Sequence, residues 1–244
     1  MAPSTRVAGS ATPAAVLFDM DGTLIESEEL WWRAECEVVD GLGGTWSRED
    51  QAHCLGGPLE RVSEHMVRIT GSTVPPAEIG RRLLETMESL LRSHEVPYRP
   101  GAVTLLRECQ ARGCPTALVS ASHRPLLLAA ADAIARGLGM DADRVFDVTV
   151  AGDEVSDSKP HPEPYLTAAR RLQVPIEECV VIEDSPTGVA SGQASGAFVV
   201  AVPDLVPIPP AARRVVVSTL EGVTLDDLGR WLADAARNPD SLRP

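Results

Sequence analysis

Residues 14–23 read AAVLFDMDGT, the most informative segment of the sequence. Its apolar, partly β-branched part ends abruptly at Asp19 and is followed by Gly22, which is typical of a buried strand that runs into a loop. Asp19 and Asp21 therefore follow the carboxyl end of a predicted strand, residues 14–18. Because ligands bind at the carboxyl ends of the strands in an open parallel sheet, we expect two carboxylates where a substrate binds.

Five further short apolar runs predict the rest of a sheet. From Gly101 onward they are separated by segments of helix length, and strands that alternate with helices indicate a parallel sheet covered on both faces. The predicted strands are residues 115–119, 145–150, 179–182, 197–202 and 214–217. The sequence thus predicts an α/β fold, with the Pro-rich residues 202–210 as a surface loop.

The segment between the first strand and residue 100 has a different character. Residues 28–40, 58–70 and 75–95 have apolar side chains at helical spacing, and no convincing strand lies among them. This all-helical block predicts a small helical cap domain inserted into the core after the first strand. We expect a disordered tail at residues 1–14, the core domain at residues 15–25 and 98–244, and the cap at residues 26–97.

The composition of the 244-residue chain excludes several classes of protein. Hydrophobic residues make up 44% and charged residues 23%, which supplies a globular core and argues against a disordered or fibrous chain. The net charge of -13, with no long Lys/Arg run, argues against binding to nucleic acid or to an anionic membrane. No uncharged apolar run approaches the roughly 18 residues that a membrane span needs.

Two further features predict the environment of the chain. The first fifteen residues lack the apolar region of a secretory signal. The five cysteines, an odd number without a C-x-x-C pair, argue against a disulfide framework and a thiolate zinc site, so we expect reduced thiols. We therefore expect a cytoplasmic protein, and a monomer.

Three more segments place reactive groups near the ends of predicted strands. Residues 120–122 (Ser-Ala-Ser) follow the second strand, where a hydroxyl and backbone N–H groups can hold a phosphoryl group. Lys159 stands among prolines in SKPHPEP, which hold the backbone extended and suit a lysine that points inward at a charge. Glu183 and Asp184 follow the strand at residues 179–182, and carboxylates suit Mg²⁺, which prefers oxygen ligands.

Each segment alone has a simpler explanation. A D-x-D-G sequence commonly forms a turn, Ser122 can cap the next helix, and a lysine before a helix is usually solvated. Glu183 and Asp184 can likewise cap the helix that Ser185 and the following proline begin. Together and in this order, however, the four segments are very specific.

The ordered set of D-x-D-G-T, Ser, Lys-Pro and Glu-Asp resembles the four motifs of the haloacid dehalogenase (HAD) superfamily of phosphotransferases. The resemblance covers residues 16–203 and implies a HAD-like, Rossmannoid parallel sheet with an inserted small helical cap. It also implies that the motifs converge on one site that binds a small phosphorylated molecule and Mg²⁺. Asp21 argues against the dehalogenase branch, because expelling a halide needs no proton donor.

The resemblance implies a catalytic role for several matching residues. Asp19 resembles the nucleophile that forms an aspartyl-phosphate, and Asp21 resembles the general acid/base that protonates the leaving alcohol and then activates water. Ser120, with the N–H of Ala121, resembles the phosphate-binding second motif. Lys159 resembles the residue that neutralises both the nucleophile and the transferring phosphoryl group.

The remaining matches concern the metal and the substrate. The residues that resemble Mg²⁺ ligands are Asp19, Asp21 through its carbonyl, Asp184 and, as an auxiliary, Glu183. Thr23 matches the positioning hydroxyl of the first motif. Glu26, which lies at the predicted hinge just after that motif, is a candidate contact to the substrate.

Within the superfamily, residues 19–39 and the segment SKPHPEPY resemble the β-phosphoglucomutase-like subfamily, most of all sugar and hexitol phosphatases such as 2-deoxyglucose 6-phosphate phosphatase. True β-phosphoglucomutases have a His in the first cap helix where this chain has Trp31. They also have cationic residues around the segment that here reads LGGPLE, residues 55–60. A cap without those cations holds a bisphosphate intermediate poorly, so we expect a phosphatase.

Two alternatives stay open at this point. The first is a phosphosugar mutase of the β-phosphoglucomutase type. The second is a catalytically silent phosphate-binding module, similar to a receiver domain. Receiver domains are much shorter and have no inserted cap, and a degenerate enzyme would have lost a motif residue, whereas none is missing here.

Overall fold

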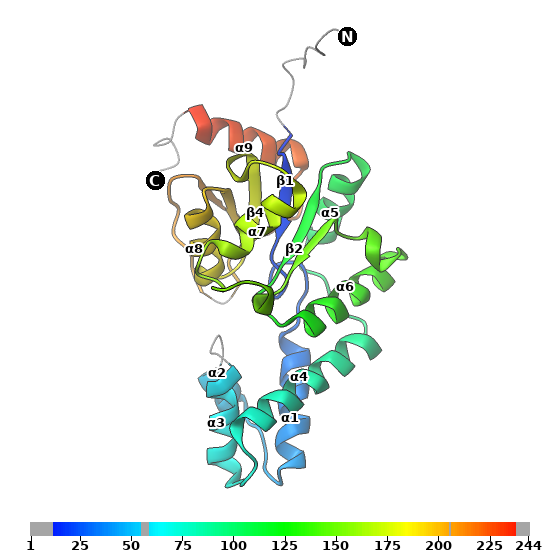
Figure 1. Ribbon diagram of the computed structural model, residues 1–244, viewed down its shortest axis with the longest axis vertical. Helices are drawn as coiled ribbons and strands as arrows, with labels where there is room; N and C mark the ends of the chain where they lie inside the picture. Colours follow the sequence, from blue (N-terminus) through cyan, green and yellow to red (C-terminus); the bar gives the residue numbers. More distant parts are fainter. Residues whose placement is uncertain (1–11, 55–58, 205, 238–244) are drawn as a thin grey trace. The chain divides into compact units, whose positions relative to one another are not determined.

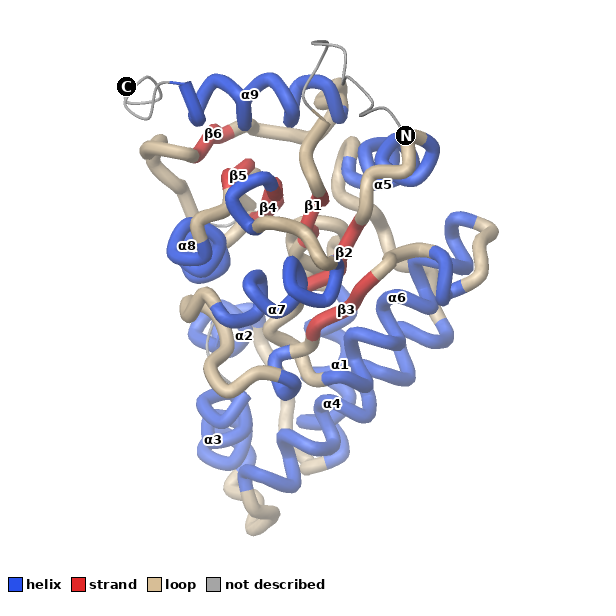
Figure 2. Tube along the Cα trace, turned by 45° about the horizontal axis from the view of Figure 1, so that its top comes forward, coloured by secondary structure: helices blue, strands red, loops and turns tan. Residues whose placement is uncertain are grey.

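The sheet that the apolar runs predict is present in the computed structural model, which describes residues 12–54, 59–204 and 206–237. Six strands, all parallel, lie in the order β3-β2-β1-β4-β5-β6 (Figure 1, Figure 2). The strands are β1 (Ala15–Phe18), β2 (Thr116–Val119), β3 (Val148–Val150), β4 (Cys179–Glu183), β5 (Phe198–Ala201) and β6 (Arg214–Val216). The predicted α/β fold with a parallel sheet is confirmed.

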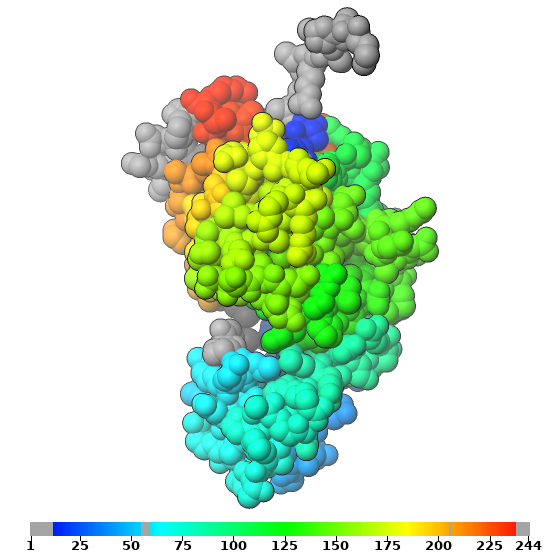
Figure 3. All heavy atoms as spheres, viewed as in Figure 1, coloured from blue at the N-terminus to red at the C-terminus, as the bar shows by residue number. Residues whose placement is uncertain are grey.

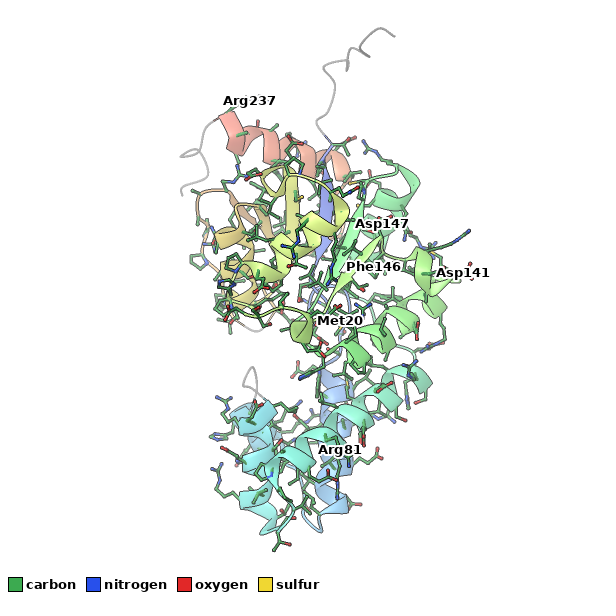
Figure 4. The ribbon with its side chains drawn as sticks, viewed as in Figure 1. Met20, Arg81, Asp141, Phe146, Asp147 and Arg237 are labelled. Carbon is green, nitrogen blue, oxygen red and sulfur yellow. The ribbon has the colours of Figure 1, made fainter. Side chains whose placement is uncertain are left out.

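The central strands have the burial that a sheet covered on both faces requires. Every residue of β1, β2, β4 and β5 is buried, which explains why these strands appear in the sequence as continuous apolar runs. β3 is shorter than the predicted 145–150. Asp147 instead accepts a hydrogen bond from the Thr116 N–H on its carboxylate at 2.8 Å, and Phe146 is buried just before the strand (Figure 4).

Helices cover the two faces of the sheet. α7 (Glu163–Leu172) lies against β1, β2 and β3, and α8 (Pro186–Ser195) lies against β4 and β5. Ala15 and Leu17 of β1 share one apolar cluster with Tyr165 of α7 and Val189 of α8. Figure 3 shows α7 and the loop before it forming the surface on this side of the sheet. On the other face, α5 (Ala102–Ala111) packs against β2 and against α9 (Leu225–Arg237) (Figure 2).

The parallel direction of the strands brings their carboxyl ends to one edge of the sheet. Met20, which lies between the two aspartates of the first motif, marks this edge beyond β1 (Figure 4). The Asp19 N–H donates to the Ile182 carbonyl of β4 at 3.0 Å, so the pairing of β1 with β4 continues into the motif. The residues that follow β1, β2 and β4 therefore meet at one place.

A second compact unit is helical. It comprises Ser27–Val96 and Leu128–Ala142, and the first unit contains the described residues up to 26, residues 97–127 and those from 143 on. Its helices are α1 (Glu28–Gly41), α2 (Arg48–Cys54), α3 (Leu59–Thr70), α4 (Pro76–Ser93) and the part of α6 (Arg124–Leu138) from residue 128 on. α4 packs against both α1 and α3. The sequence assigns residues 128–142 to the core, whereas their packing groups them with these helices.

The apolar stripes predicted for this segment are buried, but one helix was not predicted. α2 has a polar sequence, REDQAHC, and so lacks a strong apolar period. Its first turn is fixed by Ser47 and Asp50, because the Asp50 N–H donates to Ser47 Oγ at 3.2 Å and the Ser47 N–H donates to Asp50 Oδ2 at 3.0 Å. This reciprocal capping, of the S-x-x-D type, was the signal available in the sequence.

The structure also bears on the predictions for the cysteines, the Pro-rich loop and the amino-terminal tail. All five cysteines are free thiols, as expected. Residues 202–204 and 206–210 form no helix or strand, as predicted for the Pro-rich segment, although Ile208 packs into the apolar core. Most of the predicted tail, residues 1–11, and most of the LGGPLE segment, residues 55–58, lie outside the described residues. Within the described ranges, no helix is both long and apolar enough to cross a membrane.

Candidate functional site

Three carboxylates meet at the carboxyl edge of the sheet. Asp19 follows β1, Glu183 is the last residue of β4, and Asp184 comes next. β1 and β4 are neighbours with Phe18 opposite Ile182, so Asp19 lies beside Glu183. One oxygen from each of the three carboxylates lies within 4.8 Å of the others. The pairing of these strands thus concentrates negative charge in a small, largely buried volume.

Lys159 lies against this cluster. Its Nζ donates to Asp19 Oδ1 at 2.6 Å, to Glu183 Oε1 at 2.6 Å and to the Val119 carbonyl, at the end of β2, at 2.9 Å. These three acceptors use all three N–H groups of the ammonium, and only 4% of the side chain is exposed. Lys159 therefore joins the ends of β1, β2 and β4. The Lys159–Pro160 peptide is cis, and Lys159 is the only lysine in the sequence.

The carboxylate of Glu183 is completely buried and held on both oxygens. Oε1 accepts from Lys159 and from the Tyr165 hydroxyl at 2.7 Å, and Oε2 accepts from the Ser185 hydroxyl at 3.1 Å. Gly188, in the first turn of α8, packs so closely that an added Cβ would lie 1.7 Å from Oε1. The amino-terminal end of α8 also favours a negative charge at this position.

The capping alternative for the acidic pair after β4 is wrong. Ser185 is the N-cap of α8, and its hydroxyl accepts from the Gly188 N–H at 3.0 Å. The carboxylates of Glu183 and Asp184 are therefore not needed to cap this helix. Asp184 accepts a hydrogen bond from the Thr23 hydroxyl at 3.3 Å, which links the first motif to the fourth.

Burial and mutual repulsion perturb the acidic groups. Burial, followed by the charge of Glu183, raises the pKa of Asp19 well above its usual value, although the ammonium of Lys159 opposes the shift. Burial and the charge of Glu183 also raise the pKa of Asp184 to about 7. For Lys159, burial lowers the pKa, but the carboxylates of Asp19 and Glu183 outweigh it, so the net shift is upward. A single ammonium faces three acidic groups, so their full ionisation would leave an excess of negative charge.

The donor set fits a hard divalent cation. Carboxylate oxygens at this spacing are the ligands that Mg²⁺ prefers, and a cation would relieve the excess negative charge. Gly22 has φ +80°, and an added Cβ there would lie 2.4 Å from Asp184 Oδ2, so the loop passes close to this carboxylate. The residues present thus fit the magnesium site that the sequence predicts.

The Ser-Ala-Ser segment after β2 lies on the other side of the first motif. Ser120 is buried, and its Oγ accepts from the Ser122 N–H at 2.9 Å. The Ser122 hydroxyl donates to Asp21 Oδ2 at 3.4 Å, which brings the second aspartate of the motif to this segment. Ala121 is exposed. Ser122 had a second explanation as the cap of α6, but Asp153 Oδ1 accepts from the Arg124 N–H at 2.9 Å instead.

Glu26 lines a small pocket together with Thr23 and Arg99. It is exposed, and its Oε1 pairs with Arg99 Nη1 at 3.5 Å. Arg99 also pairs with Asp204 at 3.0 Å. The substrate contact predicted for Glu26 is neither supported nor contradicted by these pairs, and it stays a prediction.

Sequence reasoning missed Tyr165, Ser185 and the direct role of Ser122. The hydroxyl of Tyr165 reaches Glu183 only because α7 packs against β1, and no local pattern encodes that contact. Ser185 followed by proline is a recognisable helix start. Predicting Ser185 as the N-cap would have left Glu183 and Asp184 without a capping role. For Ser122, the spacing to the next helix favours a cap and so conceals the contact with Asp21.

Comparisons with known proteins agree with this geometry. Residues 13–196 match the family model described as haloacid dehalogenase-like hydrolase. The chain belongs to this family. The HAD resemblance drawn from the four motifs is therefore confirmed, and the parallel sheet is the HAD-like core.

Curated relatives cover most of this HAD-like hydrolase. Protein CbbY from Cereibacter sphaeroides is 35% identical over 189 residues, which cover 75% of this chain and 80% of CbbY. Hexitol phosphatase B from Escherichia coli K12 is 32% identical over 192 residues, which cover 78% of this chain and 83% of the phosphatase. A solved structure of a CbbY mutant from Rhodobacter sphaeroides with xylulose-(1,5)bisphosphate has a TM-score of 0.75 and 30% identity, and covers 88% of this chain and 99% of CbbY.

Proposed function

We propose that this HAD-like hydrolase is a Mg²⁺-dependent phosphatase that hydrolyses a small phosphomonoester of a sugar or polyol through an aspartyl-phosphate on Asp19. The observation that carries the proposal is the position of Lys159, whose buried ammonium lies 2.6 Å from both Asp19 and Glu183 at the strand ends. The ammonium opposes the rise in the pKa of Asp19 that burial and the charge of Glu183 cause, and so it favours the ionised carboxylate. An ionised, positioned carboxylate is what a nucleophile for phosphoryl transfer requires.

Asp19, Asp184 and the carbonyl of Asp21 would hold the Mg²⁺, with Glu183 as an auxiliary ligand. When bound, the cation withdraws charge from the oxygens of the transferring phosphoryl group. Thr23 orients Asp184 through its hydroxyl. The fit rests on the oxygen donors and on the excess negative charge described above.

In the first half-reaction, a carboxylate oxygen of Asp19 attacks phosphorus, and the bond between phosphorus and the ester oxygen breaks. Asp21 donates its proton to the leaving alkoxide, which departs as the alcohol. Ser120 and the Ala121 N–H bind the phosphoryl oxygens. The ammonium of Lys159 neutralises negative charge on these oxygens and on Asp19. These donors are fixed by the sheet before the substrate arrives, so little reorganisation accompanies the transfer.

In the second half-reaction, Asp21 takes a proton from water, and the resulting nucleophile attacks the phosphorus of the aspartyl-phosphate. The bond to Asp19 breaks, which releases inorganic phosphate and restores the carboxylate. Asp21 thus acts first as an acid and then as a base, and the Ser122 hydroxyl holds its carboxylate from the side of the second motif. Dividing the reaction in this way lets one site serve the leaving group and water in turn.

The substrate class is supported by the relatives. Hexitol phosphatase B and the fructose-1-phosphate phosphatase YqaB, both from Escherichia coli, are named for polyol and sugar phosphates, and CbbY was solved with a sugar bisphosphate. A small phosphorylated sugar or polyol therefore fits the proposal for this chain. We expect the protein to act as a monomer in the cytoplasm.

The test measures phosphate release from a panel of hexose, hexitol and pentulose phosphates, including a bisphosphate, with and without Mg²⁺. We expect metal-dependent release that Asp19→Asn lowers by at least about a thousandfold while the protein stays folded. Conversion of β-glucose 1-phosphate to glucose 6-phosphate at a comparable rate would instead establish the mutase. Stable phosphorylation of Asp19 without turnover would establish the binding module.

A further inference from the structure

Lys159 has a second carboxylate partner that is not the nucleophile of the proposed reaction. When Asp19 becomes an aspartyl-phosphate, its carboxylate oxygen forms the bond to phosphorus and no longer carries the charge that Lys159 faces. Glu183, 2.6 Å from Nζ and completely buried, forms and breaks no covalent bond in either half-reaction. Glu183 is therefore the fixed anchor of the ammonium.

The anchor is itself held from two sides. On the α8 side, the Ser185 hydroxyl donates to Oε2, and Gly188 leaves room for the carboxylate. On the α7 side, Tyr165 donates to Oε1 at 2.7 Å, the same oxygen that Lys159 uses. Without the tyrosine hydroxyl, Lys159 would be the sole donor to Oε1 among the hydrogen bonds described above.

Burial and its contacts fix the side chain of Tyr165 in this position. It is 0% exposed, its ring packs in the apolar cluster that includes β1 and β4, and its hydroxyl donates to the buried carboxylate of Glu183. The ring also lies beneath the ammonium, with Lys159 Nζ 5.0 Å from the ring centroid, a distance at which a cation is attracted to an aromatic face. One side chain thus contacts both members of the Lys159–Glu183 pair.

We infer that Tyr165 is a positioning residue of the site: its hydroxyl orients Glu183, and Glu183 in turn keeps Lys159 aimed at Asp19 and the phosphoryl group. The inference rests on the proposed phosphatase function. In this arrangement both oxygens of Glu183 accept hydrogen bonds from protein donors, so the carboxylate is held in place beside the ammonium.

The test replaces Tyr165 with phenylalanine, which keeps the buried ring and removes only the hydroxyl. We expect kcat to fall at least tenfold, with KM and the Mg²⁺ requirement changed less than twofold. Ser195→Ala is the matched control, since Ser195 is a buried serine of α8 whose hydroxyl donates to the Gly192 carbonyl at 2.6 Å and has no link to Lys159. The control should lower Tm by a similar amount and leave kcat unchanged.

A second measurement follows Lys159 without any turnover. Because the sequence has one lysine, protein labelled with ¹³C-lysine gives a single ε-methylene signal in an NMR spectrum. We expect two distinct proton shifts for this methylene in the wild type, since the side chain is fixed, and one averaged shift in Tyr165→Phe. An unchanged lysine signal together with an unchanged kcat would overturn the inference, and so would an equal loss of kcat in Ser195→Ala.

A double-mutant comparison separates positioning from packing. If the hydroxyl acts through Glu183, then adding Tyr165→Phe to Glu183→Gln changes kcat by less than twofold, whereas independent effects would multiply and contradict the inference. If Tyr165→Phe does not fold, Glu183→Gln is examined alone and must give the averaged lysine signal. Absence of phosphate release by the wild type with every ester would reject the proposed function, while the lysine signal would still decide whether Tyr165 positions Lys159.

Discussion

Substitution of Gly188 by alanine would place a methyl group against the carboxylate that anchors the site. The added Cβ would lie 1.7 Å from Glu183 Oε1 and 1.9 Å from the carboxyl carbon, whereas real Cβ contacts are essentially never shorter than 3.0 Å. Either the carboxylate or α8 must therefore retreat by about 1.3 Å, the difference between 3.0 and 1.7 Å. A displacement of that size breaks hydrogen bonds that are now 2.6 and 2.7 Å long.

The expected loss in the free energy of unfolding arises because displacement of the Glu183 carboxylate disrupts its ion pair with Lys159. Lys159 loses a buried partner, and disrupting a buried, hydrogen-bonded ion pair costs about 3 to 5 kcal/mol. Urea denaturation of Gly188→Ala should therefore show a lower midpoint at an unchanged slope, and phosphate release should fall by more than tenfold. The close approach makes this position unlike an ordinary helical glycine, at which alanine is favourable by roughly 0.5 to 1 kcal/mol.

Two other glycines provide graded controls. An added Cβ at Gly41 of α1 meets nothing within 4 Å, so Gly41→Ala should leave stability the same or slightly higher. At Gly192, in the same helix as Gly188, the Cβ would lie 3.0 Å from a Val181 methyl, which predicts a small loss. The reasoning is refuted if Gly188→Ala is within about 1 kcal/mol of the wild type and fully active.

Three further predictions concern the helical unit and the margins of the site. Burial raises the pKa of Glu35 from 4.5 to about 7, so its stabilising contribution is complete below pH 4.5 and is lost as the pH rises through 7. Glu35→Gln should therefore match the wild type in urea at pH 5 and exceed its free energy of unfolding by about 2 kcal/mol at pH 8, and a variant less stable at pH 8 would contradict this. Ser122→Ala removes the hydrogen bond to Asp21 and should lower kcat by about two- to tenfold with little change in Tm, whereas an unchanged kcat would show that Asp21 does not depend on it. Gly22→Ala forces a Cβ to 2.4 Å from Asp184 Oδ2, so the Mg²⁺ concentration for half-maximal activity should rise at least tenfold, and an unchanged metal requirement would argue against Asp184 as a ligand.

Much of the sheet could be predicted because its strands are buried on both faces. A strand such as β1 or β4 has no solvent-facing side, so every position is apolar and the run ends where the backbone leaves the core. The abrupt end of each run is also what predicts Asp19 and Glu183 at the carboxyl edge of the sheet. β3 was overestimated because Val145 and Phe146 are buried in a loop, and burial alone does not distinguish a strand from such a loop.

Two of the three parts that sequence reasoning missed depend on contacts between distant segments, and the third, α2, has a polar sequence. The helix α2 is polar, and its capping pair carries the signal that its apolar period lacks. Residues 128–142 have the sequence of an ordinary helix of the core, and only their packing assigns them to the helical unit. Tyr165 had no polar neighbour in the sequence to suggest that its hydroxyl faces a buried carboxylate. For residues 128–142 and for Tyr165 the deciding interaction is absent from the local pattern, whereas α2 has its capping pair in the sequence.

The way Lys159 is held has a consequence for how the chain folds. Its three acceptors, Asp19, Val119 and Glu183, lie 140, 40 and 24 residues away in the sequence. The helical unit lies between Asp19 and Lys159, so a long chain closure must precede the ion pair, and closures of this kind slow folding. During synthesis, Lys159 leaves the ribosome before Glu183. Its ammonium therefore stays unburied until β4 has emerged and paired with β1. Assembly of the site therefore marks the pairing of β4 with β1, and burial of the single lysine can be used to time that step.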